Sequence, residues 1–200
     1  MRMKPAMPPR PRPRGFTLVE LMIAVAILGI LSLLVVPGIF AYIPNYRVNA
    51  AAKALASEMN LARMRAIAQN RVHHVAFYPA TNEIRIWEDD DNDWGTPNTL
   101  IKTLSLATRF PNVSLDYNSV TGLDGAAIAQ AATFGTTANP VRATFRPNGL
   151  MADPGVFYLI PTTDKNQRDD RMRAVRASRA GQVELHRYAA GSTPPWEEYL

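Results

Sequence analysis

The stretch RGFTLVELMIAVAILGILSLLVVP, from Arg14 to Pro37, contains a long apolar run. The 21 residues of Phe16–Val36 are long enough to cross a bilayer as a helix. One of them, Glu20, is charged. An unpaired carboxylate costs about 2.5–3.5 kcal/mol at the centre of a span and less near an end. The position of Glu20 therefore indicates a partner or a special function.

The fifteen residues before this span are basic and rich in proline. They hold five prolines, no acid and five cations, namely Arg2, Lys4, Arg10, Arg12 and Arg14. Cations beside an apolar span mark its cytoplasmic side, so the chain beyond the span is expected outside the cytoplasm. Removing these five cations from the 22 basic residues leaves 17, equal to the 17 acidic residues. The composition thus gives no general argument for nucleic-acid binding, and the absence of cysteine excludes disulfides and thiolate chemistry.

Three interpretations of the apolar span compete. A secretory signal would be cut after the span at a small-residue site, and VVPGIFAYIPNY offers no clean one. A plain anchor would tolerate Glu20 poorly. A cut between Gly15 and Phe16 would instead keep the helix and give Phe16 a new α-amine.

The run Gly15-Phe16-Thr17-Leu18-Val19-Glu20, between a basic leader and about twenty apolar residues, resembles type IV prepilins. The resemblance implies that a prepilin peptidase removes residues 1–15 and that Phe16 is N-methylated. It also implies that Glu20 faces the N-terminal amine of a neighbouring subunit in a filament. A carboxylate in hydrocarbon becomes tolerable when it is paired in this way.

Helical periodicity resumes beyond the span, in residues 37–70. Pro37, Gly38 and Pro44 predict kinks rather than an end of the helix. Apolar residues then recur at three-or-four spacing, at Val48, Ala52, Leu55, Met59, Ala62 and Ala66. Asn70 can end this helix.

Residues 71–200 are predicted to form an extracytoplasmic β-rich domain. Strand-like runs occur at 74–78, 83–88, 113–117, 141–146, 156–160, 172–175 and 183–185. Their alternation predicts an antiparallel sheet with one wet face and one dry face on the helix stripe. Residues 118–140 are interpreted as a long loop with one helical turn at Ala126–Ala132. The fold class is therefore α+β, with a long N-terminal helix whose second half packs on the sheet, as in pilins.

Three later segments resemble the GspH/FimT group of minor pilins and pseudopilins. They are the helix end Leu61–Arg71, the Phe-x-Pro-x-Gly turn at Phe145–Gly149, and the last strand pair around a Ser-x-x-Gly turn at Val175–Leu185. The resemblance implies a structural subunit of an inner-membrane filament, in type II secretion or a type IV pilus. Its partners would be the peptidase, other pilins or pseudopilins, and membrane lipid before assembly.

The sequence gives no positive indication of an enzyme or a bound cofactor. It has no Gly-x-Ser-x-Gly, His-Glu-x-x-His or phosphate-loop motif. Adjacent side chains on a strand point to opposite faces, so His73 and His74 would be poor co-ligands of a metal. They are predicted to be ordinary surface or edge histidines.

The acidic run EDDDNDWG, from Glu88 to Gly95, has two interpretations. Asp89, Asp91 and Asp93 recur at every second residue, as oxygen donors do in a calcium loop. The later glycine and glutamate of that motif are displaced or missing. The alternatives are a weak calcium site and a solvated acidic hairpin tip.

A second function remains open at the basic C-terminal region. Arg173, Arg176 and Arg179 could contact DNA phosphates or a partner subunit. Some FimT-like minor pilins bind DNA for uptake through a Gly-Arg-x-Arg motif. The corresponding residues Gly181–Glu184 lack both arginines. A DNA-capturing minor pilin is therefore the alternative to a structural subunit.

Overall fold

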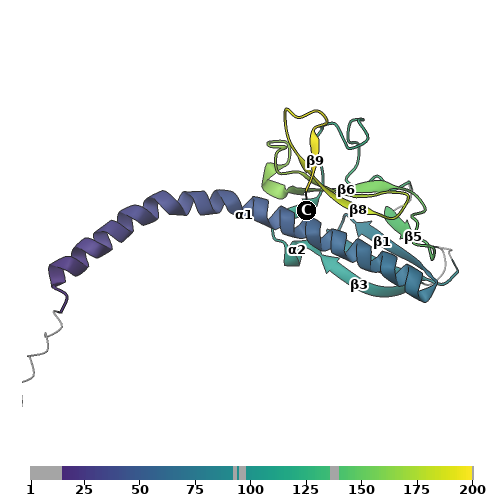
Figure 1. Cartoon of the computed structure of the whole chain (residues 1–200), viewed down its shortest axis with the longest axis horizontal. Helices are drawn as coiled ribbons and strands as arrows, with labels where there is room; N and C mark the ends of the chain where they lie inside the picture. Colours follow the sequence, from purple (N-terminus) through teal and green to yellow (C-terminus); the bar gives the residue numbers. More distant parts are fainter. Residues whose placement is uncertain (1–14, 92–93, 95–97, 136–139, 200) are drawn as a thin grey trace, which may run out of the picture. The chain divides into compact units, whose positions relative to one another are not determined.

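The computed structural model describes residues 15–91, 94, 98–135 and 140–199, without the side chains of residues 33–41 (Figure 1). The leader, apart from Gly15, lies outside the described residues, as does Asp93. The chain divides into two units, residues 1–41 and 42–200.

Helix α1, Leu18–Gln69, is continuous through Pro37 and Pro44. The prediction that these prolines do not end the helix is confirmed. In the first unit, every described side chain of the helix is exposed. Within the described residues, no helix combines the length and the apolar character that are needed to cross a membrane.

The second half of α1 is held by its apolar stripe. The six predicted stripe residues are each at most 1% exposed. The helix ends at Asn70, which adopts a left-handed conformation with φ of 53°. The amide of Arg71 then donates to the carbonyl of Ala66 at 3.2 Å. This is the bond of a Schellman motif, so the predicted role of Asn70 as the helix stop is confirmed.

The strands form two antiparallel sheets rather than the single sheet that the alternation predicts. The first sheet has the order β3-β2-β1-β5. Its strands are β1 (Val72–Tyr78), β2 (Glu83–Asp89), β3 (Thr99–Ser105) and β5 (Arg142–Phe145), and the short helix α2 (Leu106–Arg109) follows β3. A turn at residues 79–82 joins β1 to β2.

The second sheet has the order β4-β6-β7-β8-β9. Its strands are β4 (Val113–Leu115), β6 (Gly155–Pro161), β7 (Arg173–Ala177), β8 (Val183–Tyr188) and β9 (Trp196–Glu198), and the 3₁₀ helix η1 (Thr162–Asp164) follows β6. The main core combines the stripe of α1 with apolar residues of both sheets. The α+β architecture with a long helix on antiparallel sheets is confirmed (Figure 1).

The outer face of the second sheet is also covered by apolar residues, whereas the sequence predicts that this face is exposed to solvent. A second core joins Ile128, Tyr158, Met172 and Trp196, with neighbours from residues 117–123. The helical turn predicted at Ala126–Ala132 is wrong. The ends of this segment instead form β-bridges, and the amide of Tyr158 donates to the carbonyl of Ala131 at 2.8 Å.

Candidate functional site

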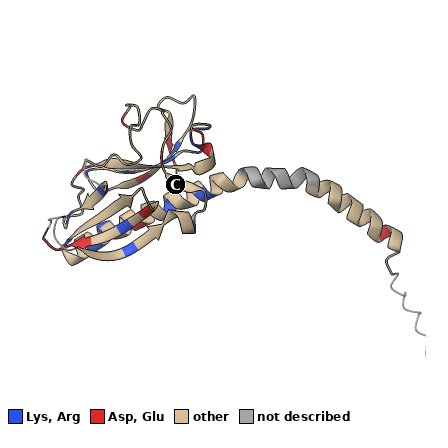
Figure 2. Ribbon diagram, turned by 180° about the vertical axis from the view of Figure 1, so that it is seen from behind, with Lys and Arg blue, Asp and Glu red and all other residues tan. Residues whose placement is uncertain are grey.

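The N-terminal segment starts with a reciprocal cap. The backbone N–H and the hydroxyl of Thr17 donate to Oε2 of Glu20 at 2.9 and 3.1 Å. In return, the amide of Glu20 donates to the Thr17 hydroxyl at 3.2 Å. This capping box satisfies the free donors of the first helical turn. In Figure 2 a red band lies near the start of α1, in a stretch that is otherwise tan as far as the grey part of the helix.

This cap was not among the predictions above, although Thr-x-x-Glu before an apolar run is its known signature. Gly15 and Phe16 precede the helix, and Phe16 is 89% exposed. A Cβ added at Gly15 would meet nothing within 4 Å. Nothing in the described part of the chain therefore demands glycine at this position.

The three segments that suggested the family meet at one arginine of α1. Nε of Arg63 donates to the carbonyl of Gly149, and its Nη2 donates to the carbonyl of Ala180, both at 3.0 Å. The amide of Met151 donates to the carbonyl of Arg179 at 3.1 Å, which ties the two turns to each other. Arg63 thus joins the helix end to both glycine turns.

Two glycines allow this junction to close. Gly149 and Gly181 have φ of +75° and +76°, a region that other residues rarely adopt. A Cβ on Gly181 would lie 2.2 Å from the Gly149 carbonyl oxygen, and one on Gly149 would lie 2.8 Å from Cδ1 of Ile67. Gly181 is therefore required by the close approach of the two turns, because its Cβ would meet a backbone atom. At Gly149 the left-handed backbone is the main requirement, since the end of the Ile67 side chain can move aside.

The acidic hairpin contains a buried hydrogen-bond partner of His74 that the sequence did not reveal. Asp89 is 0% exposed, and its Oδ2 lies 2.9 Å from Nε2 of His74. Nδ1 of His74 lies 2.9 Å from the Thr144 hydroxyl. Asp91 is exposed and donates its amide to Oδ1 of Asp89. The calcium site stays a prediction, and no cluster of three or more metal-ligating side chains occurs among the described residues.

Both adjacent histidines are buried, so the surface or edge position predicted for them is wrong. His73 is 0% exposed and His74 is 4% exposed. Desolvation lowers the pKa of His73 and the pKa of His74 below the ordinary value. Trp94 covers this outer face of the first sheet, with its ring edge-on to His74 and its face under Arg142.

The three arginines that suggested DNA contacts have different environments. Arg173 is 5% exposed and donates to the side-chain oxygens of Asn45 and Asn49 on α1, each at 2.5 Å. Arg176 is about half exposed and lies 3.8 Å from Glu184. Arg179 is exposed at the Ser-x-x-Gly turn. The structure therefore separates Arg173, which connects β7 to α1, from the two surface arginines.

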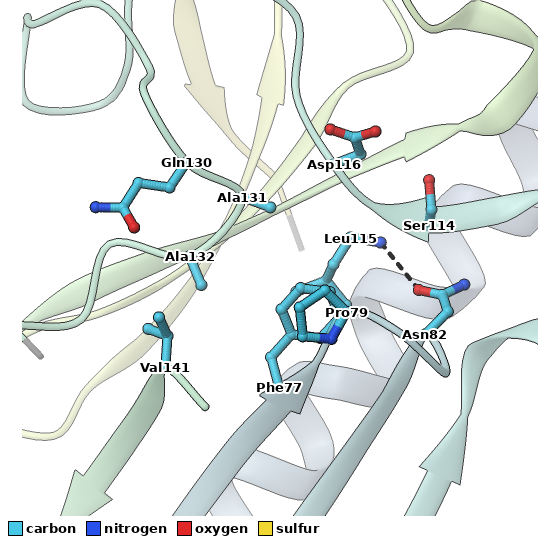
Figure 3. A pocket seen from close by; sticks show the side chains of 10 residues that line it. All are labelled: Phe77, Pro79, Asn82, Ser114, Leu115, Asp116, Gln130, Ala131, Ala132 and Val141. Carbon is cyan, nitrogen blue, oxygen red and sulfur yellow. Dashed lines mark hydrogen bonds between the residues drawn. The ribbon is translucent and has the colours of Figure 1, made fainter. Parts of the chain in front are cut away.

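A groove of about 480 Å³ lies between the end of β1, with the turn that follows it, and the strand β4 (Figure 3). Its apolar lining includes Phe77 and Leu115. The Asn82 side chain donates to the carbonyl of Val113 at 2.9 Å and accepts from the amide of Leu115 at 3.4 Å, which closes the edge of β4 (Figure 3). Asp116, the charged lining residue, pairs with Lys165. The lining thus supplies stabilising contacts and no recognisable acid/base or nucleophile arrangement.

Comparison with known families identifies two segments. Residues 10–36 match the prokaryotic N-terminal methylation motif. Residues 51–181 match the family described as type II transport protein GspH. Among curated proteins, none matches this sequence significantly.

Solved structures with a similar fold include two pilin-like proteins. The type IV minor pilin FimU of Pseudomonas aeruginosa is 16% identical, with a TM-score of 0.46 over 69% of this chain and 87% of that one. The minor pseudopilin EpsH from the type 2 secretion system of Vibrio cholerae is 16% identical, with a TM-score of 0.47 over 70% of this chain and 94% of that one.

Proposed function

The chain belongs to the family of type II transport protein GspH and is a minor pseudopilin, and from that premise we propose how it matures and assembles. It is a structural subunit rather than an enzyme. Its methylation motif implies processing by a prepilin peptidase and anchoring in the inner membrane. Its family implies other pseudopilins as partners.

Maturation removes residues 1–15 by cleavage between Gly15 and Phe16, and Phe16 is then N-methylated. Two features support this assignment. The Phe16 side chain is exposed, and helix α1 begins two residues later, so the scissile bond lies outside the helix. Since no neighbour in the described chain requires Gly15 to be small, the restriction to glycine would come from the peptidase.

Residues 16–36 form a single membrane span, and the β-rich domain lies in the periplasm. The five cations of the leader support a cytoplasmic N-terminus. Before assembly this span lies in lipid, where its exposed apolar side chains are solvated. After assembly the same side chains contact other subunits.

The hydrogen bonds of Glu20 carry the assembly proposal. Both Thr17 donors use Oε2, so Oε1 has no hydrogen-bond partner among the described residues. Cleavage leaves the amide of Thr17 intact, so the cap can persist while Oε1 accepts from the Phe16 amine of a neighbouring subunit. Breaking a fully buried ion pair of this kind costs about 3–5 kcal/mol, because it leaves one charge uncompensated.

The test is Glu20→Gln in the full chain, expressed beside the other pseudopilins. The variant should insert, be cleaved and fold, yet be recovered poorly in sheared or cross-linked filaments. Thr17→Val is the matched control, since it removes the hydroxyl of the cap and keeps the carboxylate. Thr17→Val should enter filaments much better than Glu20→Gln. Equal recovery of Glu20→Gln and the unmodified chain would refute the pairing.

A further inference from the structure

One end of the domain collects exposed apolar side chains. Among the described residues of 42–200, six large apolar side chains are strongly exposed. Three of them belong to the end of α1 or to the turn that it contacts: Met64 at 59%, Ile67 at 51% and Leu150 at 43%. Met64 and Ile67 are three residues apart, so they share one side of the helix.

The glycine turn brings Leu150 to the end of α1 that carries these two residues. A Cβ on Gly149 would lie 2.8 Å from Cδ1 of Ile67 and 3.6 Å from Nε of Arg63, so the turn lies directly against α1. Leu150 follows Gly149 directly, and its carbonyl accepts from the amide of Arg146 at 2.9 Å. Met64, Ile67 and Leu150 therefore form one surface, the turn patch, which is fixed to the helix by Arg63.

Two arginines flank the turn patch. Arg146 and Arg179 are exposed, and neither forms an ion pair with a carboxylate in the described part of the chain. Arg146 belongs to the same turn as Leu150, and the Arg179 carbonyl accepts from the amide of Met151. The patch thus has an apolar centre with cations at its rim.

We propose that the turn patch is the docking surface for an acidic, apolar-tipped segment of another pseudopilin. The apolar centre would bury a leucine-like side chain of the partner. Arg146 and Arg179 would attract the carboxylates beside it, which speeds association and selects the partner. The proposal rests on the assignment of the chain as a pseudopilin, and it assigns a partner chemistry to one specific surface.

DNA is the less suitable occupant of the same surface. Duplex binding depends on many phosphate contacts, and an apolar centre provides none. Carboxylates also occur nearby. Two of them, Glu88 and Asp90, form ion pairs with Arg71. Asp90 and Arg146 line the same hollow of about 320 Å³. A polyanion that covers this hollow would be repelled by these acids.

The test is photo-cross-linking in cells that express all the pseudopilins of the system. A benzophenone amino acid replaces Ile67 in the full chain, and the cross-linked protein is identified by mass. The expected result is one pseudopilin, cross-linked at an acidic segment. Arg146→Glu combined with Arg179→Glu should lower the cross-link yield by about tenfold, because both rim attractions become repulsions.

Matched controls come from elsewhere on the domain. The probe at Leu100, which is 45% exposed on β3, should not give this cross-link. Lys53→Glu reverses an exposed cation on α1 and should leave the yield unchanged. An equal yield from Leu100, no response to reversal of the two arginines, or a nuclease-sensitive product would each overturn the proposal.

Filament recovery is measured in the same cells, so that two failures can be told apart. If the unmodified chain enters filaments but the two arginines have no effect on the cross-link, the docking proposal alone is wrong. If the unmodified chain is cleaved but absent from every filament preparation, the assembly function is wrong, and the docking proposal is overturned with it.

Discussion

Both halves of α1 are rich in apolar side chains, but these side chains are buried within the chain only in the second half. In the second half, the stripe from Val48 to Ala66 is covered by the two sheets of the same chain. In the first half, Leu18, Met22 and Ile27 are each more than 50% exposed. The first half therefore needs lipid or other subunits, whereas the second half is complete in one chain. Substitutions in the second half should therefore change the stability of the domain, and substitutions in the first half should change assembly.

The largest effect is expected from Met59→Ala in the second half. Met59 is 0% exposed, and truncating a buried methionine destabilises a domain by about 2–5 kcal/mol. Since a domain of this size loses about 2–4 °C per kcal/mol, the melting temperature of the detergent-solubilised chain should fall clearly. Cleavage after Gly15, followed by mass, should be unaffected.

Met22→Ala is the matched substitution in the first half. Met22 is 63% exposed within its own chain, so the melting temperature of the domain should stay unchanged. A similar loss of stability in both variants would break the comparison between the two halves.

A smaller loss is expected from Gly181→Ala at the junction with Arg63. The backbone of Gly181 is left-handed, and a Cβ added there would lie 2.2 Å from the Gly149 carbonyl oxygen. Both features oppose a side chain at this position. We expect a destabilisation of about 1–3 kcal/mol, measured by thermal melting. Gly191→Ala isolates the backbone contribution, because Gly191 has φ of +92° but open space around it. If the two variants melt alike, close packing at Gly181 contributes nothing.

The smallest expected effect is a dependence of the melting temperature on pH. It comes from two buried histidines in the second unit. Burial lowers the pKa of His73 and the pKa of His74 from the ordinary value of 6.5. Below that pH the unfolded chain binds protons that the folded chain resists, so stability falls as the pH falls. The melting temperature should be flat above about pH 6.5 and decrease below it.

His74→Gln sharpens this prediction, since glutamine can keep a hydrogen bond to Asp89 but does not titrate. Its melting temperature should depend less steeply on pH below 6.5 than that of the unmodified chain. An unchanged slope would assign the pH dependence to other groups.

Much of the fold could be predicted because its signals are local. The stripe of α1 follows helical spacing, and Asn70 stops the helix where its side-chain type suggests. Two strands had no such signal. β3 is largely exposed at the edge of its sheet, so it lacks apolar alternation, and β9 has only three residues after a pair of prolines.

By itself, the sequence determined the processing motif, the apolar span and the second-half stripe, because each depends on residues that are close together in the chain. Tertiary structure decided that Arg63 joins two distant turns and that Arg173 binds α1 instead of facing solvent. It also decided that His74 and Asp89 are buried together. The partners in these contacts are 15 to 128 residues apart in the sequence, so the spacing of residue types could not pair them.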